Sequence, residues 1–111
     1  MGVTKTDLFT PRQNELSAIA KALAHPARIA ILEYLLECQS CITGSIVDKV
    51  GLAQPTISQH LRELKAVGLV QGTVEGTAVC YCINPEKWRA IQALWNGFFD
   101  HYQAPDTTAC C

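Results

Sequence analysis

Six cysteines in three close pairs are the residues of this sequence whose chemistry is easiest to recognise. Thiolate sulfur is a soft ligand, and it suits trivalent arsenic, lead, cadmium and copper(I). Neighbouring thiols also form disulfide or polysulfide links reversibly. The cysteines therefore indicate a site for a soft metal or metalloid, or a redox sensor. The pairs are Cys38 and Cys41, Cys80 and Cys82, and Cys110 and Cys111.

The three pairs differ in how well simple packing explains them. Cys38-x-x-Cys41 follows a predicted helix, where two side chains can converge on one ion, but no second C-x-x-C completes a four-ligand zinc site. Cys80 and Cys82 fall on one face of a predicted strand, where packing is the stronger interpretation. A vicinal pair on a tail has no core to pack into, and exposed thiols oxidise. The predicted metal ligands are Cys38, Cys41, Cys110 and Cys111.

A second group of chemically active residues lies between residues 54 and 65. Apolar residues at 57, 61, 64 and 67 form one stripe of a predicted helix, and amides, hydroxyls and cations occupy the opposite face. Amides and cations match base edges in the major groove of DNA, and hydroxyls and cations match phosphates. An ordinary solvated helix face is the alternative. The predicted DNA-contacting residues of this helix are Gln54, Thr56, Ser58, Gln59, His60, Arg62 and Lys65, of which His60 is given no chemistry of its own.

The elements that would position these residues can be traced along the chain. Thr10 and Pro11 begin a helix that runs to about residue 23, and a mostly apolar helix covers residues 26–37. A short helix around residues 43–50 ends at Gly51, and the helix over residues 55–67 stops at Gly68. Strand-like runs at 69–74 and 78–83 flank a hairpin loop at 75–77, with Gly76 and Thr77 expected near DNA. This order predicts a mainly α winged helix-turn-helix.

The last predicted helix, over residues 85–102, carries a stripe of aromatic side chains. They could simply fill the core, but one small domain has limited room for them. We therefore expect a homodimer in which this helix and the first helix face a partner. The predicted interface residues are Leu16, Ile19, Leu23, Trp88, Ile91, Trp95, Phe98 and Phe99.

Length and composition limit the remaining choices. A chain of 111 residues with 49% hydrophobic residues suits one domain, predicted over residues 1–103, followed by a flexible Cys-containing tail over 104–111. The net charge of −1 counts mildly against nucleic acid, but Lys49, Arg62 and Lys65 against Glu63 make residues 49–67 locally basic. The first ten residues lack an apolar run, and no stretch approaches a membrane span, so a cytoplasmic location without a membrane partner is expected.

Three stretches of the chain resemble the arsenic-repressor (ArsR/SmtB) family of bacterial transcriptional regulators. They read HPARIAIL at residues 25–32, QPTISQHL at 54–61 and GLV at 68–70, within a likeness that covers about residues 14–102. The resemblance implies a winged-helix homodimer that binds a palindromic operator and loses DNA affinity when an inducer, often a metal ion or metalloid, binds. It also implies that the helix over residues 55–67 enters the major groove and that the hairpin lies near the backbone or minor groove.

The sequence departs from that family at its known inducer sites. The family's C-V-C motif does not align, because residues 42–44 stand there and Cys41 lies just outside. Of the C-terminal zinc pattern only Asp100 and His101 are present, which argues against a cobalt or zinc sensor. Some arsenic-responsive members carry a C-terminal vicinal cysteine pair similar to this tail. We therefore expect a repressor that needs no cofactor and responds to As(III) or an organoarsenical.

Three alternatives compete with this interpretation. A redox or reactive-sulfur sensor would use the same scaffold with disulfide or polysulfide chemistry. A thiol enzyme would pair a cysteine with His60 or His101, but no motif places a nucleophile beside a base, so no enzyme is predicted. A winged helix used only for protein contacts would fail to bind DNA from its own promoter.

Overall fold

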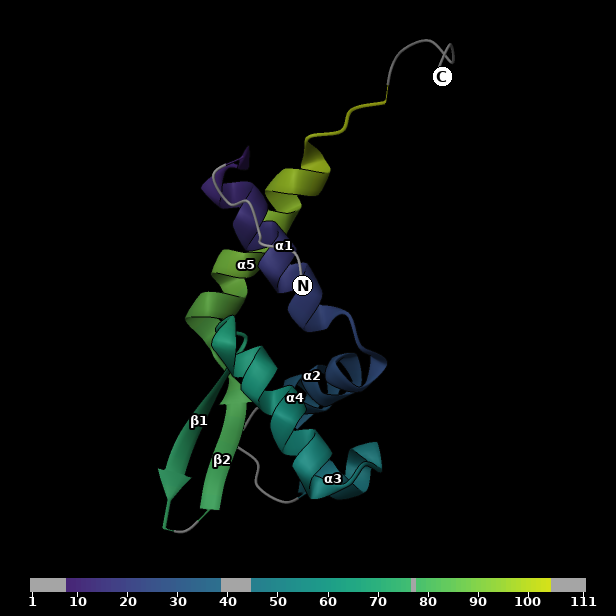
Figure 1. Cartoon of the computed structure of the whole chain (residues 1–111), viewed down its shortest axis with the longest axis vertical. Coiled ribbons are helices and arrows are strands. Elements are labelled where there is room, and N and C mark those ends of the chain that lie inside the picture. The colour runs from purple at the N-terminus through teal and green to yellow at the C-terminus, as the bar shows by residue number, and fades with distance from the viewer. Residues whose placement is uncertain (1–7, 39–44, 77, 105–111) are drawn as a thin grey trace.

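The computed structural model describes residues 8–38, 45–76 and 78–104, and it has the predicted order of elements (Figure 1). Within this part, four helices precede a two-stranded antiparallel sheet and one helix follows it. The mainly α fold with a β-hairpin is therefore confirmed. The elements are α1 (Pro11–Leu23), α2 (Pro26–Cys38), α3 (Ser45–Val50), α4 (Gln54–Ala66), β1 (Val70–Glu75), β2 (Ala78–Ile83) and α5 (Pro85–Asp100).

Capping residues explain where several helices begin. The Thr10 hydroxyl accepts from the Gln13 backbone N–H at 3.1 Å, and the Gln13 side chain accepts from the Thr10 N–H at 2.9 Å, which makes a capping box at α1. The Asn84 side chain accepts from the Lys87 N–H at 3.2 Å at the start of α5. Both of these predicted starts are confirmed.

Two glycines end helices because they accept a left-handed backbone. Gly51 follows α3 with φ of 83°, and Gly68 follows α4 with φ of 89°. After Gly68 the chain turns at once into β1, and the Leu69 N–H donates back to the Leu64 carbonyl at 3.1 Å. Gly68 thus joins the end of α4 directly to the hairpin.

One apolar core joins α2 and α4 to the remaining elements. The largest fully buried side chains include Ile31 and Leu35 of α2 and Ile57, Leu61 and Leu64 of α4. Fully burying a side chain of this size contributes about 1.5–3 kcal/mol relative to exposure. The core therefore holds one side of α4 inward against α2.

The hairpin differs from its predicted form at both ends of its first strand, because β1 spans Val70–Glu75 rather than residues 69–74. Glu75 pairs with Ala78, so two residues rather than three make the loop. Gly76 takes φ of 63° at the first loop position, which both common two-residue hairpin turns require. Cys80 of β2 is only 4% exposed, in agreement with a packing role.

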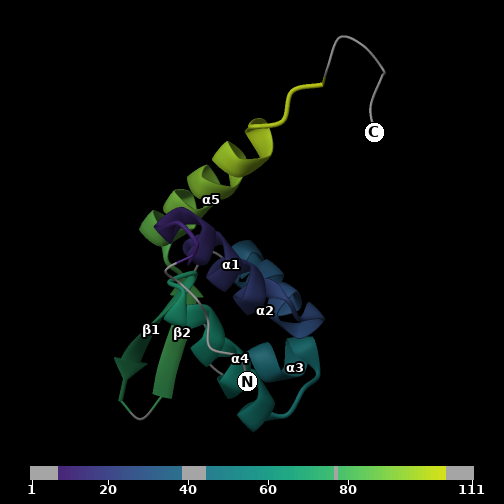
Figure 2. The same cartoon turned by 45° about the horizontal axis from the view of Figure 1, so that its top comes forward.

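Helices α1 and α5 lie side by side in both views, with the first half of α5 above the hairpin (Figures 1 and 2). The end of α5 lies near the start of α1, where Arg12, Phe98 and His101 line one hollow. The molecule is elongated, with extents of 58, 34 and 25 Å. The helix ends at Asp100, two residues before the predicted end, and α2 extends one residue further than predicted, to Cys38.

Candidate nucleic-acid interface

Helix α4 has one buried side and one exposed side. Ile57, Leu61 and Leu64 are buried, whereas the residues predicted to contact DNA lie mostly on the opposite side. Ser58 is half-buried, and the exposed members of the set are Gln54, Thr56, Gln59, Arg62 and Lys65. The structure therefore brings six of the seven predicted residues of this helix onto one accessible face.

His60 is the exception, and its prediction as a surface contact to DNA is wrong. It is 7% exposed and packs on the inner side of α4, where the His25 ring lies 4.5 Å away between ring centroids. The His60 Nδ1 accepts a hydrogen bond from the Arg28 Nε at 3.0 Å. Burial lowers the pKa of His60, and the charges of His25 and Arg28 lower it further.

Hydrogen bonds order the exposed polar side chains of α4. Arg62 Nη1 donates to the Gln59 Oε1 at 3.0 Å, and Gln59 Nε2 donates to the Glu63 Oε2 at 3.3 Å. One turn earlier, Gln54 Nε2 donates to the Ser58 hydroxyl at 3.1 Å. Arginine has five N–H donors, so Arg62 keeps most of them for another acceptor.

The N-terminus of α4 carries no side-chain cap. Ala53 occupies the capping position and has no side-chain acceptor. Pro55 has no backbone N–H to satisfy, which leaves the amides of Gln54 and Thr56 at the exposed end of the helix. Uncapped amides at a helix start attract phosphate oxygens.

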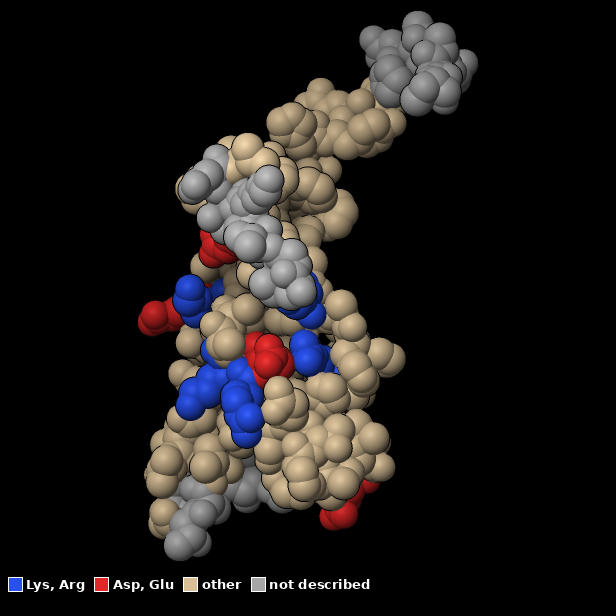
Figure 3. Space-filling model, viewed as in Figure 1, with Lys and Arg blue, Asp and Glu red and all other residues tan. Residues whose placement is uncertain are grey.

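Positive charge gathers around the second half of α4. Figure 3 shows Lys and Arg side chains over the middle of this face, with an acidic side chain among them. Residues 70–83 of the hairpin include no Lys or Arg. Gly76 is exposed at the tip, and Thr77 lies outside the described residues. Attraction to phosphates would therefore come from α4 and its neighbours rather than from the hairpin.

Only one of the four predicted cysteine ligands lies within the described residues. Cys38 is a half-buried thiol at the last residue of α2, and Cys41, Cys110 and Cys111 lie outside the described residues. Within residues 8–38, 45–76 and 78–104, no three His, Cys, Asp or Glu side chains gather as metal ligands would. Cys82 is half-buried, and its Sγ accepts from the Gln71 Nε2 at 3.5 Å.

The predicted dimer-face residues fall into two groups. Leu16, Ile19 and Ile91 are buried within their own chain, so they already have a core to fill. The others are half-buried or exposed, and Trp95 stacks on Phe99 while Phe98 meets both rings edge-on. The half-buried residues are Leu23, Trp88 and Trp95, and the exposed ones are Phe98 and Phe99.

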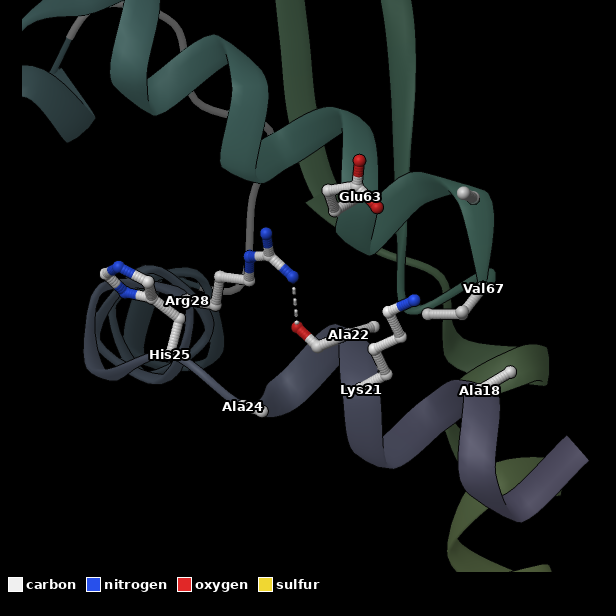
Figure 4. Close-up of a pocket in the computed structure, with 9 residues that line it drawn as sticks. Ala18, Lys21, Ala22, Ala24, His25, Arg28, Glu63 and Val67 are labelled. Atoms are coloured by element: carbon white, nitrogen blue, oxygen red, sulfur yellow. Dashed lines mark hydrogen bonds between the residues drawn. The ribbon is translucent and has the colours of Figure 1, made fainter. Parts of the chain in front are cut away.

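His25 and Arg28, at the start of α2, were not among the functional residues predicted from the sequence. The His25 Nδ1 accepts from the Ala27 N–H at 3.0 Å and so caps α2. Arg28 Nη1 donates to the Ala22 carbonyl at 3.1 Å (Figure 4). Both line a hollow of about 670 Å³ between α1, α2 and α4, together with Lys21 and Glu63. The feature of the sequence that could have marked this site is the histidine before Pro26, at the expected start of a helix.

Helices α3 and α4 are joined by a short turn and followed by the hairpin, and the exposed side of α4 is polar. This arrangement defines the winged helix-turn-helix class, whose members bind DNA through the second of these two helices. Residues 25–71 match the sequence model of the bacterial regulatory proteins of the arsR family. The chain belongs to this ArsR family of transcriptional regulators.

Individual relatives agree with this assignment. The chain is 46% identical over 63 residues to the transcriptional repressor SmtB of Mycobacterium tuberculosis, a stretch that covers 57% of this chain and 46% of that protein. Over 83 residues it is 36% identical to an HTH-type regulator of Methanocaldococcus jannaschii, covering 75% of this chain and 93% of that one.

A solved structure supports the fold over nearly the whole chain. The solution structure of a homodimeric winged helix-turn-helix DNA-binding domain from Mycobacterium bovis matches with a TM-score of 0.63 and 26% identity. The match covers 94% of this chain and 97% of that one. In the part of our structure that is described, no helix is both long and apolar enough to cross a membrane.

The buried ring of His60 predicts a pH-dependent stability. Because its pKa is lower in the folded protein than the ordinary value of 6.5, the unfolded chain takes up the proton first as pH falls. The contribution of His60 is therefore complete above the unfolded pKa. It is lost progressively as pH falls from about 6.5 towards the folded pKa.

Urea unfolding of the wild type and of His60→Asn between pH 8 and pH 5 would measure this effect. Asn keeps an acceptor near the Nδ1 position but does not titrate, whereas His25, Lys21 and Glu63 around the same region are present in both proteins. We expect the free energy of unfolding to fall more steeply for the wild type below about pH 6.5. Equal slopes in the two proteins would contradict the prediction.

Proposed function

We propose that this protein is a homodimeric transcriptional repressor that inserts α4 into the major groove of a palindromic operator. The observation that carries the proposal is the exposed polar face of α4, with Arg62, Gln59 and Ser58 on it and the core behind it. Arg pairs well with guanine edges and Gln with adenine edges. The uncapped amides at the start of α4 suit a backbone phosphate.

Substitution of Arg62 tests the DNA interface directly. Arg62 is exposed and donates its hydrogen bond to exposed Gln59, so Arg62→Ala should leave the fold intact. Loss of one such contact costs about 1–3 kcal/mol, or about 5-fold to 150-fold in affinity. Fluorescence anisotropy with duplex DNA from the protein's own promoter would measure the loss.

Arg89→Ala supplies the matched control. It removes the same charge from an exposed position of α5, outside α4 and on the side of α5 opposite Phe98. The control should bind DNA within about threefold of the wild type, because exposed residues away from the interface contribute little. Equal affinities of the Arg62→Ala variant and the wild type at two salt concentrations would refute the α4 interface.

The homodimer is supported by the surface of α5. Its second half carries the ring cluster of Trp95, Phe98 and Phe99, of which Phe98 and Phe99 are exposed. Contiguous exposed apolar surface of this kind marks a protein interface. The similar Mycobacterium bovis domain is itself homodimeric. Two-fold symmetry would place two α4 helices about 34 Å apart, one DNA turn.

A charged side chain on the exposed surface of α5 should prevent dimerisation. Phe99 is 65% exposed in the single chain, and Phe99→Glu would bury an unpaired carboxylate in the dimer. Sedimentation should therefore find a monomer. Val74→Glu, at a hairpin residue that is 72% exposed, is the matched control and should remain dimeric. A dimeric Phe99→Glu protein would place the interface elsewhere.

For the inducer, we propose trivalent arsenic bound by the thiolates of Cys38, Cys41 and the Cys110-Cys111 pair, from either protomer. Cys38 supports this proposal as a half-buried thiol at the end of α2, a helix that packs on α4. Binding there would change the position of α4 and so couple the inducer to DNA, with a coupling of about 1–3 kcal/mol.

Substitution of the tail cysteines tests the inducer site. Arsenite or phenylarsine oxide should release the wild type from promoter DNA but leave the Cys110→Ser/Cys111→Ser variant bound. Cys80→Ser/Cys82→Ser should respond like the wild type, because both residues belong to β2 and the Cys80 side chain is buried. Intact-mass measurement after arsenite and after an oxidant separates a metalloid adduct from the redox alternative. Unchanged release of the tail variant would exclude this ligand set.

A further inference from the structure

Arg28, in the first turn of α2, donates hydrogen bonds to two other helices. Its Nη1 donates to the Ala22 carbonyl in α1, and its Nε donates to the His60 ring in α4. The last carbonyls of a helix have no partner within that helix, so a cation there satisfies an acceptor and opposes the helix dipole. One planar guanidinium therefore connects the end of α1 to the middle of α4.

The two histidine rings restrict how this guanidinium can lie. His60 accepts through Nδ1, an arrangement that requires a neutral ring with its proton on Nε2. His25 also accepts through Nδ1, from the Ala27 N–H, and its ring rests on that of His60 at 50° between planes. His25 is itself fixed as the residue that begins α2. The acceptor for Arg28 is thereby held from the α2 side as well as from α4.

We propose that Arg28, His60 and His25 form a positioning bridge that sets the orientation of α4 relative to α1 and α2. The proposal rests on the proposed role of α4 in reading DNA. The apolar contacts of Ile57, Leu61 and Leu64 are non-directional, so they permit small rotations and shifts of α4. The hydrogen bonds of Arg28 are directional, and they restrict those movements. No residue of the bridge needs to touch the duplex.

The bridge also connects α4 to α1, the helix that lies beside α5. In the views of Figures 1 and 2, α1 lies along α5, and Ala22 is in its last turn. A change in the position of α1 in a dimer would therefore move the Ala22 carbonyl relative to Arg28. The same guanidinium would then transmit the change to His60 and α4.

Three variants test the bridge against simple packing. His60→Leu removes the acceptor and keeps an apolar side chain, and His60→Asn keeps an acceptor near Nδ1. Ile57→Val perturbs a neighbouring buried position of α4 without touching the bridge. Promoter affinity should fall about tenfold or more for His60→Leu, the scale of one lost hydrogen bond to a charged group. It should stay within about threefold of wild type for the other two variants.

A measurement without DNA makes the test independent of the proposed function. The Leu23 amide belongs to the peptide group whose carbonyl, from Ala22, accepts from Arg28. Its NMR resonance should shift in His60→Leu and remain in place in His60→Asn and Ile57→Val. Long-range nitrogen spectra of the wild type should show an unprotonated Nδ1 on His60 at neutral pH.

The outcomes separate the two ideas. If Arg62→Ala weakens DNA binding but His60→Leu does not, the bridge is wrong and the proposed function stands. If the wild type does not bind its promoter, the proposed function fails, and the bridge is judged by the Leu23 and His60 resonances. An unmoved Leu23 resonance in His60→Leu, or a protonated Nδ1 on His60, overturns the bridge.

Discussion

The packing of α4 against α2 is the contact on which the remaining arrangement depends. Ile57, Leu61 and Leu64 enter one core with Ile31 and Leu35, and this leaves α4 a single outward side. A rotation of α4 by half a turn would expose these side chains and bury Arg62 and Lys65, at a cost of several kcal/mol. The accessible face of the helix is thus a consequence of what its other face buries.

The parts of the fold that could be predicted from the sequence are those set by local signals. Apolar residues at helical spacing, prolines and polar residues at helix starts, and glycines at helix ends are local signals, and the helices begin close to where these signals lie. The errors lie at ends and loops, where one backbone pairing decides the boundary. Pairing of Glu75 with Ala78 shortened the hairpin loop, and α5 stopped at Asp100.

The errors in the site have a different origin. His60 stands three residues after Ile57 and one before Leu61, so it belongs to the buried stripe, but its polar side chain drew it into the predicted DNA-contacting set. Helical spacing also cannot distinguish a side chain that fills its own core from one that fills a partner's. Ile19 and Phe98 follow the same kind of stripe, yet one is buried in its own chain and the other exposed.

The hydrogen bonds among the exposed side chains of α4 have a consequence for recognition. Arg62, Gln59 and Glu63 hold one another in place before any duplex arrives, so part of their rotamer freedom is already lost in the unbound protein. Immobilising such a side chain on binding costs about 0.5–1.5 kcal/mol of entropy. A helix that presents these side chains in advance opposes association less, and a mismatched base then meets a surface with little freedom to adapt to it.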